Sequence, residues 1–148
     1  LVGTWDVAAE FTPAPGAPTM TATGVQVNEW TLGGRWLNGS YQSEFMGQPF
    51  EGFGRWGYDN AKKEYVSTWT DSMSTGLMID RGSYDAKTKT FTMMGKILDP
   101  ITDSEVVSKS VYTVDGPDQF TLVAYNGPDV ENMTKTMKLV YTRQKTAK

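Results

Sequence analysis

Hydrophobic and polar residues alternate along most of the chain, and each alternating segment stops at a turn signal. Successive side chains of a strand point to opposite sides of the sheet, so this alternation predicts strands with one apolar face. In residues 3–12 the apolar face would consist of Trp5, Val7, Ala9 and Phe11. The three-to-four-residue spacing of a helix is hard to find anywhere. The pattern predicts about ten short antiparallel strands, in a single domain that covers residues 1–148.

Clusters of glycine, proline and asparagine interrupt the alternation and mark the predicted turns. They lie at residues 13–18, 33–34, 47–49, 59–62, 116–118 and 127–129. Between them, four predicted strands each place aromatic and small residues on one face, and in the first three of these strands we expect it to be the inner face. These sets are Leu37, Gly39, Tyr41, Ser43 and Phe45; Phe50, Gly52, Gly54, Trp56 and Tyr58; Tyr65, Ser67, Trp69 and Asp71; and Phe91, Met93, Gly95 and Ile97.

An antiparallel meander of this kind has two edge strands that must be protected from pairing with other chains. Closure into a barrel removes both edges, so we predict an all-β fold, an antiparallel up-and-down β-barrel of about ten strands. Because eight strands already enclose room for side chains or one small ligand, about ten should leave a cavity unless aromatic side chains fill it. A β-sandwich is the alternative, favoured if the loops at residues 13–18 and 99–103 cross between two sheets.

The composition narrows the range of partners and cofactors. A net charge of −3 gives no basic surface, so we expect no nucleic-acid partner, and no apolar run approaches the ~20 residues of a membrane span. Cysteine and histidine are both absent, which removes disulfides, cysteine nucleophiles and the commonest general base and metal ligand. We predict no metal site and no cofactor. The acidic residues Asp99, Asp103 and Glu105 lack the spacing of a calcium-binding loop.

The compartment and the oligomeric state are left open by the sequence. The chain starts at Leu1 without an initiator methionine, so a signal peptide could have preceded it. A soluble protein of the cytoplasm and one exported to the periplasm or beyond are both compatible with a cysteine-free chain.

Two sets of motifs resemble known families. Gly3-Thr4-Trp5 in the first predicted strand, with Arg143 near the end of the last, resembles the calycin pattern of lipocalins and fatty-acid-binding proteins. In those proteins a G-x-W packs against a basic residue of the closing strand. The resemblance therefore implies a structural end plug made by Trp5 and Arg143, and an indole face is a suitable cation–π partner for a guanidinium.

The longer match covers nearly the whole chain. It consists of G-G-R-W-L at Gly33–Leu37, G-x-P-F-E-G at Gly47–Gly52, G-Y-D at Gly57–Asp59, K-x-Y-V-x-x-W-x-D-S from Lys63 to Ser72, and Y-T-R at Tyr141–Arg143. Together these motifs are similar to those of the bacterial family called domain of unknown function 1579. The resemblance implies a calycin-like, lipocalin-like antiparallel barrel, and no established activity accompanies it.

Four aromatic residues on the predicted inner face, Tyr41, Trp56, Tyr58 and Trp69, are candidates for the wall of a ligand pocket. They could equally fill the barrel, since tryptophan and tyrosine often dominate a core. Tyr141 and Arg143 lie two positions apart, so they could together hold a ligand carboxylate. The alternative is that Arg143 stacks over Trp5 as the end plug.

Charged side chains on the same inner face are the remaining candidates. Arg81 follows Ile79 on an otherwise apolar face, and a buried guanidinium needs a partner, so Glu29 or Asp71 could pair with it. Otherwise Arg81 would be available to an anionic group of a ligand. Glu29 shares its face with Val25 and Val27 in residues 20–32.

Three functional hypotheses follow from these candidates. The first is a non-enzymatic barrel that binds a small hydrophobic or amphipathic molecule through Tyr41, Trp56, Tyr58, Trp69, Asp71, Arg81 and Tyr141. The second is an enzyme in which a buried carboxylate such as Asp71 works beside Arg81, although no nucleophile–base pair is evident. The third is a structural or interaction module with a filled interior.

Overall fold

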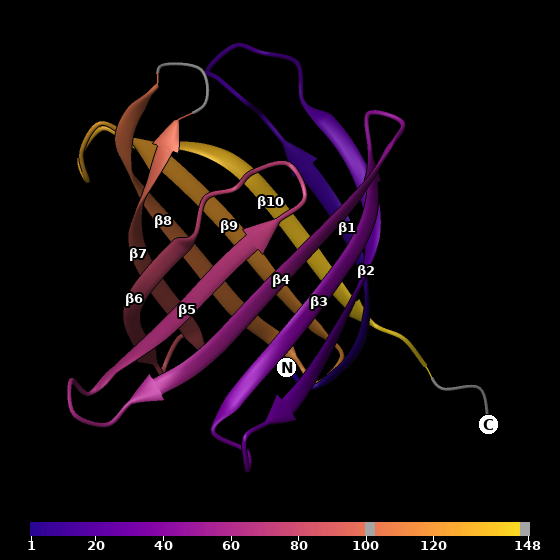
Figure 1. Cartoon of the computed structure of the whole chain (residues 1–148), viewed down its shortest axis with the longest axis vertical. Coiled ribbons are helices and arrows are strands. Elements are labelled where there is room, and N and C mark those ends of the chain that lie inside the picture. The colour runs from indigo at the N-terminus through magenta and orange to yellow at the C-terminus, as the bar shows by residue number, and fades with distance from the viewer. Residues whose placement is uncertain (100–102, 146–148) are drawn as a thin grey trace.

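The computed structural model describes residues 1–99 and 103–145, which form ten β-strands and no helix. Their bounds are β1 (Gly3–Phe11), β2 (Met20–Thr31), β3 (Trp36–Phe45), β4 (Gln48–Asp59), β5 (Glu64–Asp71), β6 (Met78–Asp85), β7 (Thr90–Asp99), β8 (Ser104–Gly116), β9 (Gln119–Gly127) and β10 (Thr134–Arg143) (Figure 1). The described residues therefore include no helix long and apolar enough to cross a bilayer.

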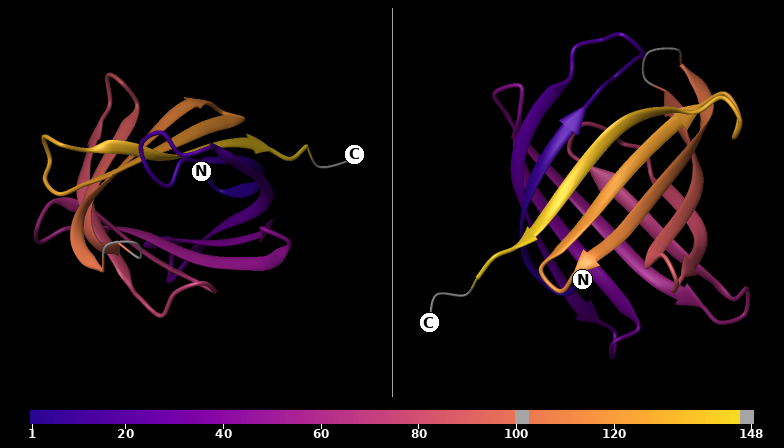
Figure 2. Two further views of the ribbon diagram at one scale, coloured as in Figure 1. Left: turned by 90° about the horizontal axis from the view of Figure 1, so that it is seen from above. Right: turned by 180° about the vertical axis from the view of Figure 1, so that it is seen from behind.

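The strands form one closed antiparallel barrel, which confirms the predicted fold. Each strand pairs with its neighbour in the sequence, and β1 pairs with β10 to close the ring. Closure aligns Trp5 with Arg143 and Val7 with Tyr141, and Figure 2 shows β10 running beside β1. The loop at residues 13–18 joins two paired strands, so it does not cross between sheets as a sandwich would require. Residues 100–102 of the acidic loop lie outside the described residues.

Tight turns join several of the consecutive strands. Between β2 and β3, Gly33 and Gly34 have φ of 69° and 79°, a region that glycine adopts without the steric penalty of a side chain. The turn is further closed by a hydrogen bond from the Gly34 amide to the Thr31 carbonyl at 3.1 Å. These glycines were predicted as a turn from the sequence, and they set the end of β2.

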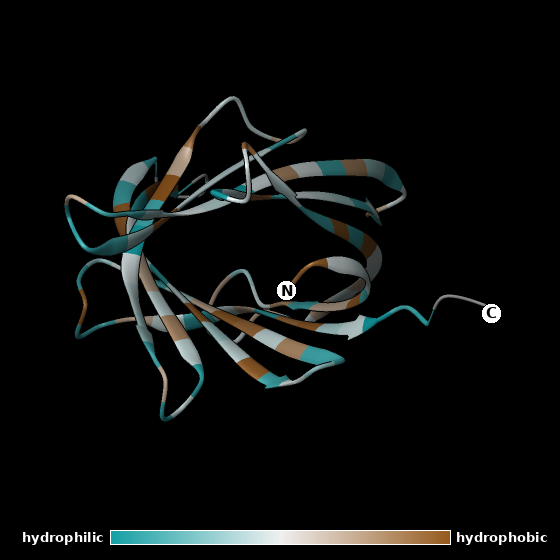
Figure 3. Cartoon of the chain, turned by 90° about the horizontal axis from the view of Figure 1, so that it is seen from below, coloured by the Kyte–Doolittle hydropathy of each residue, from teal (hydrophilic) through white to brown (hydrophobic). Residues whose placement is uncertain are grey.

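The inner faces follow the predicted alternation in most strands, and bands of opposite hydropathy alternate along the ribbons in Figure 3. Leu37 and Tyr41 of β3 are buried as expected, and Met93 of β7 is buried as well. The main apolar cluster is formed mostly by β1, β9 and β10 and consists of Trp5, Val7, Ala9, Tyr41, Phe120, Leu122, Leu139 and Tyr141.

Alternation fails as a guide to the inner face in β2. Val25 and Val27 point outward, with 37% and 41% of their surfaces exposed, whereas Asn28 is buried. The pairing of β2 with β1 decides which residues of β2 face inward, because directly paired residues of antiparallel strands share a face. Buried Trp5 pairs with Gln26, which fixes Gln26 as an inward position.

The same mechanism corrects the expectation for β6. Asp80 pairs with buried Ser67 and is itself only 2% exposed, so Asp80 faces inward and Arg81 faces outward. The expected inward position of Arg81 is therefore wrong. On the outer surface its guanidinium forms an ion pair with Glu64 at 2.7 Å, and neither Glu29 nor Asp71 is its partner.

One end of the barrel is occupied by aromatic rings. This aromatic end holds the turns at residues 32–35, 60–63, 86–89 and 117–118. The Arg143 guanidinium lies 4.2 Å from the ring of Trp5, and Phe120 meets the same indole edge-on at 4.7 Å. A second group of rings continues across the barrel, in contact through Phe91: Trp56, Tyr65 and Tyr84, with Tyr58 packed on Tyr65.

Candidate functional site

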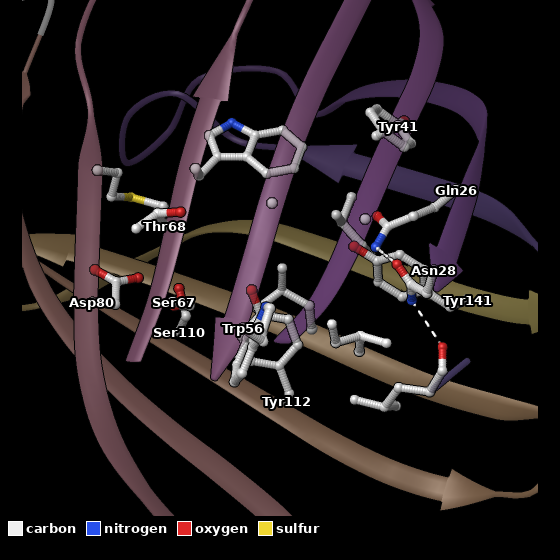
Figure 4. Close-up of a pocket in the computed structure, with 18 of the residues that line it drawn as sticks. Gln26, Asn28, Tyr41, Trp56, Ser67, Thr68, Asp80, Ser110, Tyr112 and Tyr141 are labelled. Carbon is white, nitrogen blue, oxygen red and sulfur yellow. Dashed lines mark hydrogen bonds between the residues drawn. The ribbon is translucent and has the colours of Figure 1, made fainter. Parts of the chain in front are cut away.

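The interior holds a cavity of about 280 Å³, which is lined by residues of strands β1 to β6 and β8 to β10 (Figure 4). Five of the seven residues predicted to bind a ligand line it: Tyr41, Trp56, Trp69, Asp71 and Tyr141. Their presence in one wall is a matter of geometry, and a role for them in binding stays a prediction. The aromatic side chains do not fill the barrel.

The Trp69 indole lies flat against the barrel wall, which leaves the centre of the cavity open. The Trp69 indole covers Gly52 and Gly54 of the adjacent strand β4, so closely that a Cβ at position 52 would overlap its six-membered ring. Tyr41 lies across Gly24 in a similar way, with its hydroxyl over the glycine. The two rings are 6.5 Å apart and form one continuous aromatic wall.

Asp71 holds the Trp69 indole in this position. Its Oδ2 accepts a hydrogen bond from Trp69 Nε1 at 2.9 Å, and its Oδ1 accepts one from the Met73 amide at 3.0 Å. The carboxylate therefore links the cavity wall to the start of the β5–β6 turn. The expected enzymatic pair of Asp71 and Arg81 is not assembled, because Arg81 lies outside the barrel.

Asp80 is the charged residue that sequence patterns did not single out. Its carboxylate faces the cavity, covers Gly95 of β7 and accepts a hydrogen bond from Ser108 Oγ at 3.4 Å. Burial raises the pKa of Asp80 above its ordinary value, and the hydrogen bond from Ser108 offsets this only in part. Ionised Asp80 is thus unfavourable unless a partner reaches it from the cavity.

Hydroxyl groups surround the inner side of Asp80. Ser67 of β5 is its direct strand partner, and Ser110 and Tyr112 of β8 line the same part of the cavity. Burial, followed by the charge of Asp80, raises the pKa of Tyr112. The Tyr112 hydroxyl, which like any tyrosine is protonated at neutral pH, is thus even less acidic than usual and can donate a hydrogen bond.

A second polar group lies on β2. Gln26 Nε2 donates to Asn28 Oδ1 at 2.8 Å, and Asn28 Nδ2 donates to the Leu1 carbonyl at 2.9 Å. The Leu1 carbonyl also accepts a hydrogen bond from Trp5 Nε1 at 3.0 Å. Both amides line the cavity above Gly39, which leaves room for them, so this polar surface is already hydrogen-bonded within the protein.

Tyr141 lies between the apolar cluster and the cavity. Its ring stacks on Phe120 at 4.0 Å, nearly parallel, and 4% of its surface is exposed. Burial is the main reason that the pKa of the Tyr141 hydroxyl is raised well above its usual range, with smaller effects from Tyr112 and Tyr41. Tyr141 is therefore a neutral part of the wall.

Arg143 is directed away from Tyr141's cavity face and into the aromatic end. Besides stacking on Trp5, its guanidinium donates hydrogen bonds to the Val2 carbonyl at 2.7 Å and, through two nitrogens, to the Pro117 carbonyl. A joint carboxylate site of Tyr141 and Arg143 is thus not assembled, and the arrangement is that of the alternative end plug.

Tyr58 and Arg81 are the two predicted binding residues that do not line the cavity. Tyr58 has the expected inward parity, but it lies at the rim of the aromatic end, where it is 48% exposed and packs on Tyr65. Parity along a strand cannot show where the strand leaves the barrel. Arg81 differs for the reason given above, the register of β6.

The described residues contain no group of three or more acidic side chains arranged to hold a metal ion. Of the acidic residues near the loop at residues 99–103, Glu105 pairs with Lys96 of β7. The cavity can nevertheless offer hydrogen-bond acceptors and donors to an organic molecule, through Asp80 and the hydroxyls beside it.

Comparisons with known proteins place the chain among proteins of unknown function. A family profile described as "Protein of unknown function (DUF1579)" matches residues 1–143. The crystal structure of Rv2717c from M. tuberculosis is similar, with a TM-score of 0.70, 17% identity, and coverage of 98% of this chain and 93% of that chain. A structure of EF1p2_mFAP2b bound to DFHBI gives a TM-score of 0.48 at 15% identity over 97% and 94% of the two chains. No curated protein matches. At these identities the structural similarity bears on the fold alone.

Proposed function

We propose that this chain, which belongs to the DUF1579 family of proteins of unknown function, binds a small amphipathic molecule inside its barrel. The observation that carries the proposal is the cavity of about 280 Å³, whose mostly apolar wall includes several aromatic side chains and the inward-facing carboxylate of Asp80. Mostly apolar pockets with a few placed polar groups are typical of small-molecule sites.

The size of the cavity limits the ligand. A cavity of about 150 Å³ is enough to bind benzene, so 280 Å³ should hold roughly eleven non-hydrogen atoms. A single aromatic ring with a short polar side chain satisfies this limit, whereas a long acyl chain or a macrocycle does not. Trp69 and Tyr41 offer ring faces on which such a molecule can stack.

Filling the cavity from within provides the test. Ser67→Phe places a ring in the lumen beside Asp80, and Thr70→Phe places the same ring on the exposed face of the same strand. Titration calorimetry with phenethyl alcohol, a neutral probe of suitable size, should show binding to the wild-type protein and to Thr70→Phe.

Ser67→Phe should bind the alcohol at least about tenfold more weakly, since one ring occupies most of the space of another. Circular dichroism should confirm that both variants retain the β-sheet signal. If the wild-type protein binds no probe, or if both variants bind equally, the cavity is not a binding site and the proposal is wrong.

A further inference from the structure

Within the cavity the charge distribution is one-sided. Among the described residues, its lining includes two carboxylates, Asp71 and Asp80, and no lysine or arginine side chain, and the α-amino group of the lining residue Leu1 lies toward Arg143 at the aromatic end. The two carboxylates differ in their partners. Asp71 is hydrogen-bonded by Trp69 and Met73, whereas Asp80 receives only the long hydrogen bond from Ser108.

We propose that the ligand carries a protonated amine, and that the Asp80 carboxylate is the group that receives it. This inference rests on the proposed function, because it specifies the polar end of the molecule bound in the barrel. The apolar end would lie against Trp69 and Tyr41, and the amine would lie beside Asp80 and the hydroxyls of Ser67 and Ser110.

The chemistry of the wall favours an amine over other polar groups. An ammonium has three donors, and the neighbourhood of Asp80 supplies acceptors in its own carboxylate and in the hydroxyl oxygens of Ser67 and Ser110. An anionic ligand would meet two carboxylates and no cationic side chain. A neutral alcohol would leave the buried charge without a counter-ion, which is the costly arrangement.

Three cationic side chains on β6, β7 and β8, the strands beside Asp80, have partners elsewhere. Arg81 follows Asp80 in the sequence but pairs with Glu64 outside the barrel, and Lys96 pairs with Glu105. Lys109, beside Ser108 and Ser110 on β8, lies over the outer ring of Tyr125. Among the described residues, none of these three cations therefore serves as the counter-ion of Asp80, and a cationic ligand would supply one.

Binding of an amine should depend on pH. Two other titratable groups line the cavity with Asp80 on the neighbouring strands: Tyr112 of β8, whose hydroxyl is influenced by the charge of Asp80, and Asp71 of β5. Strand β7 presents Met93 and Gly95 there. Because burial raises the pKa of Asp80, the carboxyl becomes neutral at a higher pH than an exposed aspartate would. Below that pKa the affinity for an amine should fall about tenfold per pH unit.

The experiment compares phenethylamine, phenethyl alcohol and phenylacetate, which share one ring and differ in the polar group. Titration calorimetry on the wild-type protein at neutral pH should show the amine bound roughly tenfold to a hundredfold more tightly than the alcohol, and the carboxylate most weakly. Asp80→Asn should abolish the preference for the amine. Glu64→Gln removes a carboxylate from the outer surface and should leave the preference unchanged.

The outcomes separate this inference from the proposed function. If the alcohol binds and the amine binds no more tightly, the cavity is a binding site and the amine inference is wrong. Retention of the preference in Asp80→Asn would also overturn it. If none of the three probes binds, the proposed function fails and the inference fails with it. The wild-type comparison does not depend on whether Asp80→Asn folds.

Discussion

Replacing Gly52 by alanine should push the Trp69 indole off the barrel wall and into the cavity. The added Cβ would overlap the six-membered ring of Trp69, and the strand backbone on which it is built has little freedom to retreat. A displaced indole would also lose the geometry of its hydrogen bond to Asp71. Gly54, two residues along the same face, provides the control, because a Cβ there would lie 3.3 Å from the Trp69 ring.

The size of the effect follows from two opposing contributions. Overpacking of a well-packed site typically costs 1–3 kcal/mol, so about 2 kcal/mol is a reasonable central value for Gly52→Ala. Alanine also restricts the unfolded chain, which returns about 0.4–1 kcal/mol. The net loss should be about 1–2 kcal/mol, equivalent to a fall in Tm of about 2–8 °C for a domain of this size. Gly54→Ala should change the free energy of unfolding by less than about 1 kcal/mol.

Two measurements on the same pair of variants check the argument. Thermal unfolding followed by circular dichroism gives the difference in Tm, and titration with phenethyl alcohol gives the loss of affinity. Gly52→Ala should bind about tenfold more weakly, equivalent to about 1.4 kcal/mol, because the indole occupies part of the lumen. Equal Tm values and equal affinities for the two variants would show that Trp69 is not held against Gly52.

Three other predictions concern the end plug, the buried carboxyl and the outer ion pair. A double-mutant cycle of Trp5→Leu and Arg143→Met, measured by urea unfolding, should give a coupling energy of about 1 kcal/mol, and strictly additive losses would contradict the contact. Folding raises the pKa of Asp80 above its ordinary 3.8, so the penalty for ionising it is absent below that pH and complete above the raised pKa. Asp80→Asn should therefore raise the free energy of unfolding at about pH 7 and leave it nearly unchanged at about pH 3, and an equal effect at both would refute the assignment. Arg81→Ala should change stability by less than about 1 kcal/mol and leave probe binding intact, since its pair with Glu64 is exposed; loss of binding would return Arg81 to the site.

The barrel itself was predictable because its turns carry strong local signals. Gly33-Gly34 and the proline-containing turns divide the chain into strands whose number determines the topology. Within the meander β3–β5, the distances between turns are short, so parity could be followed from Leu37 to Asp71 without error. This continuity is why Tyr41, Trp56, Trp69 and Asp71 of the cavity wall were found from the sequence.

Asp80 could not be found in this way. In the segment from Leu77 to Arg81, one face would carry Leu77, Ile79 and Arg81, and the other would carry Met78 and Asp80. Each face has apolar residues and one charge, so alternation cannot decide which of them is buried. The decision is made by a long-range constraint, the pairing of Ser67 with Asp80. One signal was available, because Ser67 was already assigned to the inner face. If the β5–β6 turn had been assigned its correct length, the register of the two strands would have placed Asp80 opposite Ser67.

The pairing of β1 with β10 has a consequence for how the barrel forms. Every other ladder joins consecutive strands and can develop as a hairpin, whereas this ladder pairs Trp5 with Arg143, which are 138 positions apart in the sequence. The entropic penalty of closing so large a loop grows only logarithmically with its length, but it must be met before the contacts between the two strands contribute. We therefore expect the β1–β10 seam to be the last ladder to form during folding. The end plug of Trp5 and Arg143 forms only at that step, so the cavity would be closed at this end only in the last stage of folding.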